Sequence, residues 1–310
     1  MNFQEFCMYL KKGIEDYLGY NTKVSLNHVV KNNGVSLEGL AIMEDGKNIS
    51  PTIYLNGYYE EYQNGKSQMI IMRDILNLYE KSRVETNFDV DFFTDFEKVK
   101  GRIVYKLINY QKNQEILKEI PHRRIFDLAI VYYCLISNDS IGNATILIFN
   151  KHMDMWGVLE EDLFSISERN TEKLLGMEIK NMDDIMMEML RNTFNEKAGG
   201  EESRQMLDSM KEDGKRSPMY VLTNREKMNG AICILYSQVL DDFAEAVGND
   251  LFILPSSIHE VILVPAEPGI TIEELERMVK EVNETQVEEE EVLSNRVYFF
   301  SRQSGKIKFQ

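Results

Sequence analysis

Hydrophobic and polar positions in the first eighty residues follow two different periods. Apolar side chains recur at helical spacing over residues 3–18 and again over 69–79. Between these stretches, VSLNHVV and VSLEGLAIM flank the sequence KNNG, and TIYLN follows the chain break Ser50-Pro51. Runs of β-forming residues on both sides of an Asn-Gly pair are typical of a β-hairpin. The N-terminal region therefore predicts helices around a hairpin and a third short strand.

The central region predicts a helix followed by a pair of strands. Apolar residues lie on one side of a helical stretch over 91–119. The run DLAIVYYCLI, residues 127–136, is apolar on both faces and predicts a buried strand with ATILIFN as its antiparallel neighbour. Helices are expected near 160–175 and 182–194. In the second helix most methionines share one face and are expected in the core, whereas Met187 lies off that face and suits a partner groove.

The last third of the chain, 218–310, predicts the order β-α-β-β-α-β-β. MYVLTN is a strand, and AICILYSQVLDDFAEAVG is one helix that ends at Gly248. LFILP and EVILVP should pair as antiparallel neighbours across a short Pro/Ser turn. Thr271 and Glu274 form a capping box that opens a second helix. RVYFFS and KIKFQ are expected to close the unit as a hairpin.

These elements predict an α+β fold of mainly antiparallel sheets with helices packed on them, in two or three integrated sub-domains. The expected units are an N-terminal α/β unit at 1–85, a central helix and strand-pair region at 86–194, and a C-terminal domain at 218–310. The segment 195–217 is polar and holds three glycines. We expect it to be a mobile linker that a protease cuts first.

Composition limits the compartment and the class of partner. A chain of 310 residues with 43% hydrophobic residues can bury substantial cores. Its 35 basic and 51 acidic residues give a net charge of −16, which opposes binding to nucleic acid or anionic lipid. The first residues lack the apolar run of a signal peptide, and no stretch approaches eighteen consecutive apolar residues. Cysteines at three distant apolar positions indicate reduced, packed thiols, so we expect a cytoplasmic protein without a membrane span.

The turn sequence PSSIHE offers the residue types of a hydrolase. Ser256, Ser257 and His259 lie between two predicted strands, where a turn exposes polar side chains. A nucleophilic serine usually stands on a G-x-S-x-G elbow between a strand and a helix, and this sequence has none. The bend of a hairpin is therefore the favoured interpretation. A hydrolase built on this turn, with His122 or Arg123 brought near it, is the enzyme alternative.

Basic residues concentrate in the segment 98–124. Eight lysines and arginines stand there against two glutamates, and His122, Arg123 and Arg124 follow directly after Pro121. Planar guanidinium groups at the edge of a core suit an anion, so these three residues are the tentative binding site. Pairing of Arg123 and Arg124 with internal carboxylates is the favoured outcome in so acidic a chain. Binding of nucleic acid or another anion through 98–124 remains a further alternative.

No motif indicates a metal, a cofactor or a catalytic residue. The sequence DGKRS lacks both the upstream glycine and the Ser or Thr that a phosphate-binding loop requires. The histidines are scattered, without the spacing of a zinc site. Asp89, Asp91 and Asp95 suit the start of the helix that follows better than a cation site. The acidic run Glu288–Glu291 is expected to face water.

The run ILPSSIHEVILVP, with the acidic residues up to Ser294, resembles an uncharacterised family of anaerobic gut bacteria, domain of unknown function 5688. PHRRIFDLAIVYY and YVLTN share the resemblance, which covers nearly the whole chain. The succession of strand pair, Trp-Gly, helix and YVLTN-like strand is similar to a second uncharacterised family, from bacilli. Both resemblances imply a bacterial cytosolic protein with one integrated architecture, and neither supplies catalytic residues. The preferred function is therefore non-catalytic binding of an unknown protein or small molecule.

Overall fold

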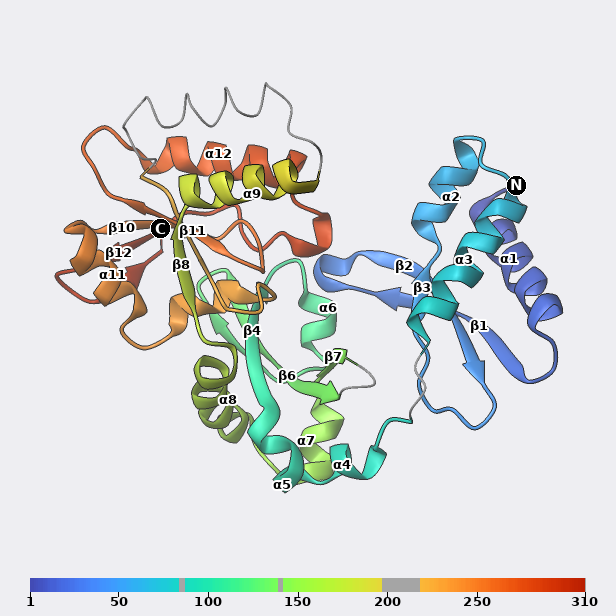
Figure 1. Cartoon of the computed structure of the whole chain (residues 1–310). Helices are drawn as coiled ribbons and strands as arrows, with labels where there is room; N and C mark the ends of the chain where they lie inside the picture. The colour runs from blue at the N-terminus through green and yellow to red at the C-terminus, as the bar shows by residue number, and fades with distance from the viewer. Residues whose placement is uncertain (84–86, 139–141, 197–217, 310) are drawn as a thin grey trace.

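The computed structural model describes residues 1–83, 87–138, 142–196 and 218–309. Figure 1 shows an α+β architecture in which helices pack on three separate β-sheets. Within these ranges all strand pairs are antiparallel. The predicted fold class is confirmed. None of the described helices has the length and apolar character that crossing a membrane requires.

The N-terminal sheet has the strand order β1-β2-β3, and three helices pack on it. Its elements are α1 (Phe3–Leu18), β1 (Thr22–Val30), the 3₁₀ turn η1 (Asn32–Gly34), β2 (Ser36–Glu44), β3 (Thr52–Tyr54), α2 (Asn56–Gln63) and α3 (Gln68–Ser82). The predicted hairpin is confirmed, and Val30 pairs with Ser36 at its end. Asn33 and Gly34 adopt positive φ angles at the tip, a conformation that these residue types tolerate best.

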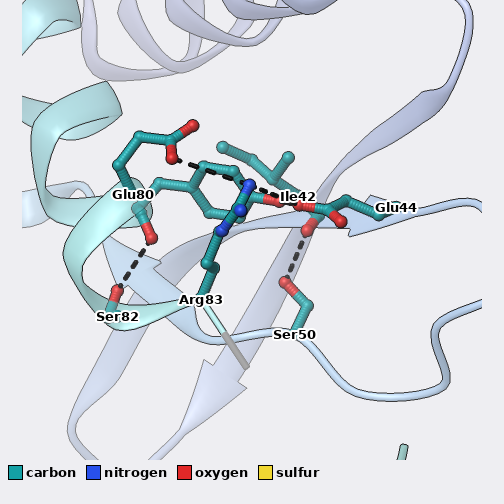
Figure 2. A network of polar contacts seen from close by, with 7 residues as sticks. Ile42, Glu44, Ser50, Glu80, Ser82 and Arg83 are labelled. Carbon is teal, nitrogen blue, oxygen red and sulfur yellow. Dashed lines mark hydrogen bonds and ion pairs between the residues drawn. The ribbon is translucent and has the colours of Figure 1, made fainter. Parts of the chain in front are cut away.

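The end of α3 is tied to β2 by a polar network (Figure 2). The Tyr79 hydroxyl donates to a Glu44 carboxylate oxygen at 2.7 Å, and Arg83 lies 3.6 Å from the same oxygen. Arg83 also approaches Glu80 at 3.7 Å, while Ser50 donates to the Ile42 carbonyl at 2.8 Å. Burial, followed by the bond to Glu44, raises the pKa of Tyr79. The contacts of Tyr79 and Arg83 with Glu44 hold the C-terminal end of α3 against β2.

The central sheet is built around β6, which β4 pairs on one edge and both β5 and β7 pair on the other. Its elements are α4 (Val90–Thr94), α5 (Phe96–Val99), η2 (Lys100–Arg102), β4 (Ile103–Asn109), α6 (Gln114–Leu117), β5 (His122–Ile125), β6 (Leu128–Asn138), β7 (Gly142–Leu147), α7 (Asn150–Trp156) and α8 (Glu160–Leu175). The predicted buried strand and its antiparallel neighbour are confirmed. Asp89 and Asp95 cap the short helices α4 and α5, as predicted.

The helical stretch predicted for 91–119 is wrong, because its middle is the strand β4. Ile103, Val104, Tyr105, Leu107 and Ile108 are all buried, on both faces of the sheet. A strand that is apolar on both faces shows no period of two, so its side chains also fit a helical spacing. Pairing with β6 decides the outcome in favour of a strand.

The third sheet has the order β13-β12-β10-β11-β9-β8. Its elements are β8 (Glu178–Asn181), α9 (Met182–Glu196), β9 (Tyr220–Thr223), η3 (Gly230–Leu235), α11 (Val239–Val247), β10 (Leu251–Leu254), β11 (Val261–Pro265), α12 (Ile272–Thr285), η4 (Glu289–Glu291), β12 (Tyr298–Ser301) and β13 (Lys306–Lys308). The β10–β11 hairpin, the β12–β13 hairpin and the Thr271 cap are confirmed. The single helix predicted for 231–248 is wrong, because Tyr236 is extended and Gln238 is left-handed between η3 and α11.

One large core joins the central and C-terminal sheets. It contains one face of β4 and β6, the buried turn η3, and one face of β10 and β11. The opposite face of the C-terminal sheet packs against α12. Asp127, between β5 and β6, accepts hydrogen bonds from Ser294 at 2.7 Å and Tyr298 at 2.6 Å, which fixes the two sheets together.

The division of the chain into units remains our proposal. The C-terminal sheet takes its edge strand β8 and the helix α9 from residues before the expected linker 195–217. Residues 197–217 lie outside the described part of the structure, so their expected mobility stays a prediction.

Candidate functional site

The three residues of the tentative anion site do not converge. On β5, Arg123 lies on the face opposite to its neighbours His122 and Arg124. A nitrogen of the Arg123 guanidinium lies 2.8 Å from Glu160, and the group stacks over the Phe164 ring at 3.8 Å. The bond to Glu160 raises the pKa of Arg123. Arg123 therefore has the internal carboxylate partner that its position predicted.

On the other face of β5, Arg124 and His122 contact the same aromatic ring. The Arg124 guanidinium lies 4.4 Å from the Tyr110 ring centre, and its Nε donates to the Phe126 carbonyl at 3.3 Å. The His122 ring packs against Tyr110, and its Nδ1 lies 3.1 Å from the Ile120 carbonyl. Both side chains thus have partners within the chain, but the carboxylate partner expected for Arg124 is not found among the described residues.

The polar turn at 255–260 is tightly built into the protein. Ser257 is only 4% exposed, and its Oγ accepts the backbone N–H of His259 at 3.0 Å. The Ser256 carbonyl accepts the Leu293 N–H at 2.8 Å, and Ser257 forms a β-bridge with Val292. These bonds connect the bend of the β10–β11 hairpin to the segment that follows η4.

Both ring nitrogens of His259 are occupied. Nδ1 accepts the backbone N–H of Asn229 at 3.2 Å, so the neutral ring carries its proton on Nε2. Nε2 lies 3.2 Å from a carboxylate oxygen of Glu291 and donates to it. A general base must instead accept the proton of the nucleophile, and neither nitrogen faces a serine hydroxyl. Burial raises the pKa of Glu260, while the nearby His259 and a hydrogen bond with Ser257 act in the opposite direction.

Three distant parts of the chain meet at the tip of the β1–β2 hairpin, which reaches towards α6 in Figure 1. Asn33 and Asn113 exchange two hydrogen bonds of 2.8 and 3.0 Å, and both residues are buried. The Asn33 amide also donates to the carbonyls of Glu289 and Val292, at 2.8 and 2.7 Å. Asn32 donates to the Glu290 carbonyl at 2.6 Å. We call this meeting of the hairpin tip, β4–α6 and η4 the junction.

A half-open pocket of about 160 Å³ lies at the junction, and we call it the junction pocket. It is lined by Val30, Lys31, Asn32, Lys106, Ile108, Asn113, Ile116, Ile120, Val131, Leu147 and Phe149. Lys106, Ile108 and Val131 stand on the face of the central sheet that points away from the large core. The floor of the pocket is therefore apolar and its polar groups come from the hairpin tip, β4 and Asn113.

Lys106 is the unusual ionisable group of this pocket. Burial lowers its pKa, and the positive charge of Lys31 lowers it further. Among the described residues, no carboxylate oxygen lies within 4.0 Å of either ammonium group, and the nearest ring contacts are Tyr133 at 5.8 Å for Lys106 and Tyr54 at 4.5 Å for Lys31. Two buried acceptors of the junction, Asn32 Oδ1 and Glu290 Oε2, have no hydrogen-bond partner in the described chain; Asn32 lines the pocket and Glu290 does not.

The sequence pattern did not single out Lys106. In the sequence it is one of eight basic residues of 98–124, and nothing in the charge pattern distinguishes it from the others. The signal that would have identified it is its position in IVYKLI, where one lysine interrupts a strand that is apolar on both faces. Burying a charge in such a strand is costly, so a pocket is expected beside the lysine.

One protein family matches nearly the whole length of the chain. The model of a family described as a family of unknown function, DUF5688, matches residues 3–302. This chain belongs to that family. No curated protein and no solved structure matches it. Because the DUF5688 family has no described function, the candidate site rests on the geometry of this chain alone.

The cysteines of this DUF5688 member are poor nucleophiles. Cys7, Cys134 and Cys233 are free and buried. Burial raises the pKa of Cys7 and of Cys134 to about 11, and that of Cys233 to about 12. The thiolate is the reactive form, so these groups react slowly at neutral pH. Across the described ranges, no cluster of three or more His, Cys, Asp and Glu side chains is arranged to hold a metal ion.

Two methionines of α9, Met182 and Met189, line a second pocket of about 350 Å³. Met182, Ile185 and Met189 form one wall, and residues of β8, β9 and β11 form the other. Met186 is 37% exposed and Met189 is 64% exposed. The expectation of core packing is therefore wrong for these two residues, because α9 lies over the edge strand β8.

Proposed function

We propose that this DUF5688 protein is a non-catalytic binding protein that takes a small molecule into the junction pocket. The observation that carries the proposal is Lys106, a partly buried cation without a carboxylate partner in the described chain, at a pocket where three chain regions meet. Perturbed ionisable groups in a concave site between structural units are a common feature of binding sites. The hairpin tip that helps to close the pocket is held by hydrogen bonds from buried amides.

The hydrolase alternative has less support in the geometry of the polar turn. Catalysis by a serine needs a hydrogen bond between its hydroxyl and a free base nitrogen. The nitrogens of His259 bind Asn229 and Glu291, and Ser257 is almost fully buried. These contacts favour a structural role for the turn, which anchors the segment carrying η4.

Nucleic-acid binding through 98–124 has less support as well. Several of its lysines form ion pairs with acidic residues three positions away: Lys98 with Asp95, Lys100 with Glu97, and Lys118 with Glu115. The segment is also divided among helix, strand and turn, so its charges point in different directions. A cytoplasmic location remains part of the proposal and is supported by the three unpaired, buried cysteines.

The test compares a variant with a filled pocket and a variant altered elsewhere. Ile116 is partly buried and lines the junction pocket, so Ile116→Trp should fill it. Ile70→Trp places the same side chain on the exposed side of α3 and serves as the control. A panel of small organic acids, amines, sugars and nucleosides is screened by thermal shift with both variants and the original protein. At least one compound should stabilise the original protein and Ile70→Trp but not Ile116→Trp. A panel without such a compound would refute the proposed function.

A further inference from the structure

We infer that the ligand of the junction pocket is a small organic anion, with a carboxylate or phosphate head and a short apolar body. This inference rests on the proposed function and specifies its ligand. It follows from three features of the pocket: the charge at one side, the apolar floor at the other, and the fixed position of the hairpin tip.

The positive charges of the pocket belong to Lys31 and Lys106. Both line the pocket, and the field of Lys31 is strong enough at Lys106 to lower its pKa. Two like charges near each other, one of them partly desolvated, destabilise the empty site. An anion placed between them reverses both effects, because it attracts each ammonium group and screens their repulsion. The neighbouring Glu290 does not take this place, since no ion pair joins its carboxylate to either lysine.

The floor of the pocket selects the rest of the ligand. Ile108, Ile120 and Val131 belong to a small buried cluster, and Leu147 and Phe149 pack against it. A ligand that was all charge would leave this apolar surface in contact with water. A short apolar body covers it, at about 25 cal/mol for each Å² buried. The pocket is smaller than those that hold drug-sized ligands, so a body of a few carbons fits better than a nucleotide.

The junction also holds Lys31 in place before a ligand arrives. Lys31 directly precedes Asn32 and Asn33, which are tied to η4, to Val292 and to Asn113 by five hydrogen bonds between 2.6 and 3.0 Å. Its ammonium group stacks on Tyr54, which leaves its charge unpaired but restricts its motion. A cation that is positioned in advance loses less entropy on binding.

A purely structural role for Lys106 makes different predictions. A lysine can bury its aliphatic stem and direct its ammonium group to water, with no ligand involved. In that case anions would bind no better than neutral compounds of the same shape. Charge selectivity at the pocket therefore separates the two explanations.

The experiment is calorimetric titration of the full chain with ligands matched in shape. The acids are butanoate, 4-methylpentanoate, benzoate and 2-methylpropyl phosphate, and the controls are 4-methylpentanamide and 4-methylpentan-1-amine. At least one acid should bind, at least tenfold more tightly than the amide and the amine. Lys106→Met should weaken its binding tenfold or more and Lys31→Met by a smaller factor, whereas Lys118→Met should have no effect. Whether the carboxylates or the phosphate bind more tightly identifies the head group.

Chemical labelling of lysines gives a second measurement that is independent of the binding enthalpy. A lysine with a lowered pKa is acetylated faster at neutral pH than an ordinary one, and a bound anion should protect it. Mass spectrometry after brief treatment with acetic anhydride should show protection of Lys106 by the tightest acid, with Lys118 unchanged.

The possible failures are distinguishable. If the amide or the amine binds as well as the acids and Lys106→Met changes nothing, the anion inference is wrong while the junction pocket remains a binding site. If no acid binds, the inference is also wrong, and the screen with Ile116→Trp then decides whether the proposed function survives.

Discussion

The polar turn around His259 and the junction pocket around Lys106 both hold ionisable side chains, and both lie beside η4. His259 has a partner for each ring nitrogen, and nearby Ser257 is buried and hydrogen-bonded. Lys106 has no carboxylate partner among the described residues, and burial lowers its pKa. The turn has the residue types associated with catalysis. The pocket has only one unusual feature in the sequence, a lysine within an otherwise apolar strand. Under the proposed function, the partners of a polar side chain indicate its role better than its residue type.

The physical basis of this contrast is the cost of removing polar groups from water. A buried polar group that keeps its hydrogen bonds contributes to stability, and such a group is usually structural. A buried charge without a partner costs free energy in every folded molecule. Proteins tolerate that cost most often at sites where a ligand removes it. Four substitutions test whether the turn and the pocket differ in this way.

The largest effect is expected at the junction itself. In Asn33→Asp the side chain loses both N–H donors and places a negative charge against the carbonyls of Glu289 and Val292. Leaving buried acceptors unpaired should lower the free energy of unfolding by about 2–3 kcal/mol. Urea denaturation measures it, with the exposed Asn27→Asp on the same hairpin as the control. Equal effects of the two substitutions would contradict a tightly held junction.

A smaller loss is expected at the polar turn. His259→Ala removes the acceptor of the Asn229 N–H and the partner of Glu291, so it should lower the free energy of unfolding by about 1–2 kcal/mol. The affinity for any ligand of the junction pocket should stay within threefold. If an activity is found, this variant should retain it. A hundredfold loss of activity with an intact fold, about 2.7 kcal/mol of transition-state stabilisation, would return the turn to the candidate catalytic sites.

Substitution of Lys106 in the pocket should raise the free energy of unfolding, whereas the two substitutions above lower it. Lys106→Met keeps the aliphatic stem and removes the charge, so it should raise the free energy of unfolding by about 1 kcal/mol at pH 7. The folded protein holds this proton less tightly than the unfolded chain, so the penalty is present below the lowered pKa of Lys106. It fades as the pH rises towards the ordinary value of 10.5, and the advantage of the variant should shrink in parallel. Denaturation at pH 7, 8.5 and 10 measures this trend.

A control for this prediction is Lys118→Met, since the Lys118 side chain is 66% exposed. It should change stability little at any of these pH values. If Lys106→Met instead destabilised the protein at pH 7, the ammonium group would have a favourable partner and the contrast with His259 would disappear.

The smallest effect is expected for Arg123→Ala. Its ion pair with Glu160 is 38% exposed on the arginine side, so the loss should be at most about 1 kcal/mol. Any stabilisation by phosphate compounds should survive this substitution and be lost in Lys106→Met. Thermal shift measures both. The reverse pattern would make Arg123 and its basic segment the anion site.

The amino-acid sequence determined the elements whose signals are local. The hairpin tip at Asn33 and Gly34, the caps at Asp89 and Thr271 and the end of α11 at Gly248 all follow from neighbouring residues. Each depends on a backbone conformation or a hydrogen bond within a few positions. The family resemblance was also evident from the sequence, and the match over 3–302 confirms it.

Only the tertiary structure decided which apolar runs are strands and which ionisable groups lack partners. β4 is a strand because β6 pairs with it, although its spacing also fits a helix. His259 is satisfied by Asn229 and Glu291, which are about thirty positions away on either side. The pocket brings Lys31 beside Lys106 across more than seventy positions. Desolvation and electrostatic attraction depend on distance in space, and a linear pattern carries no record of that distance until the chain has folded.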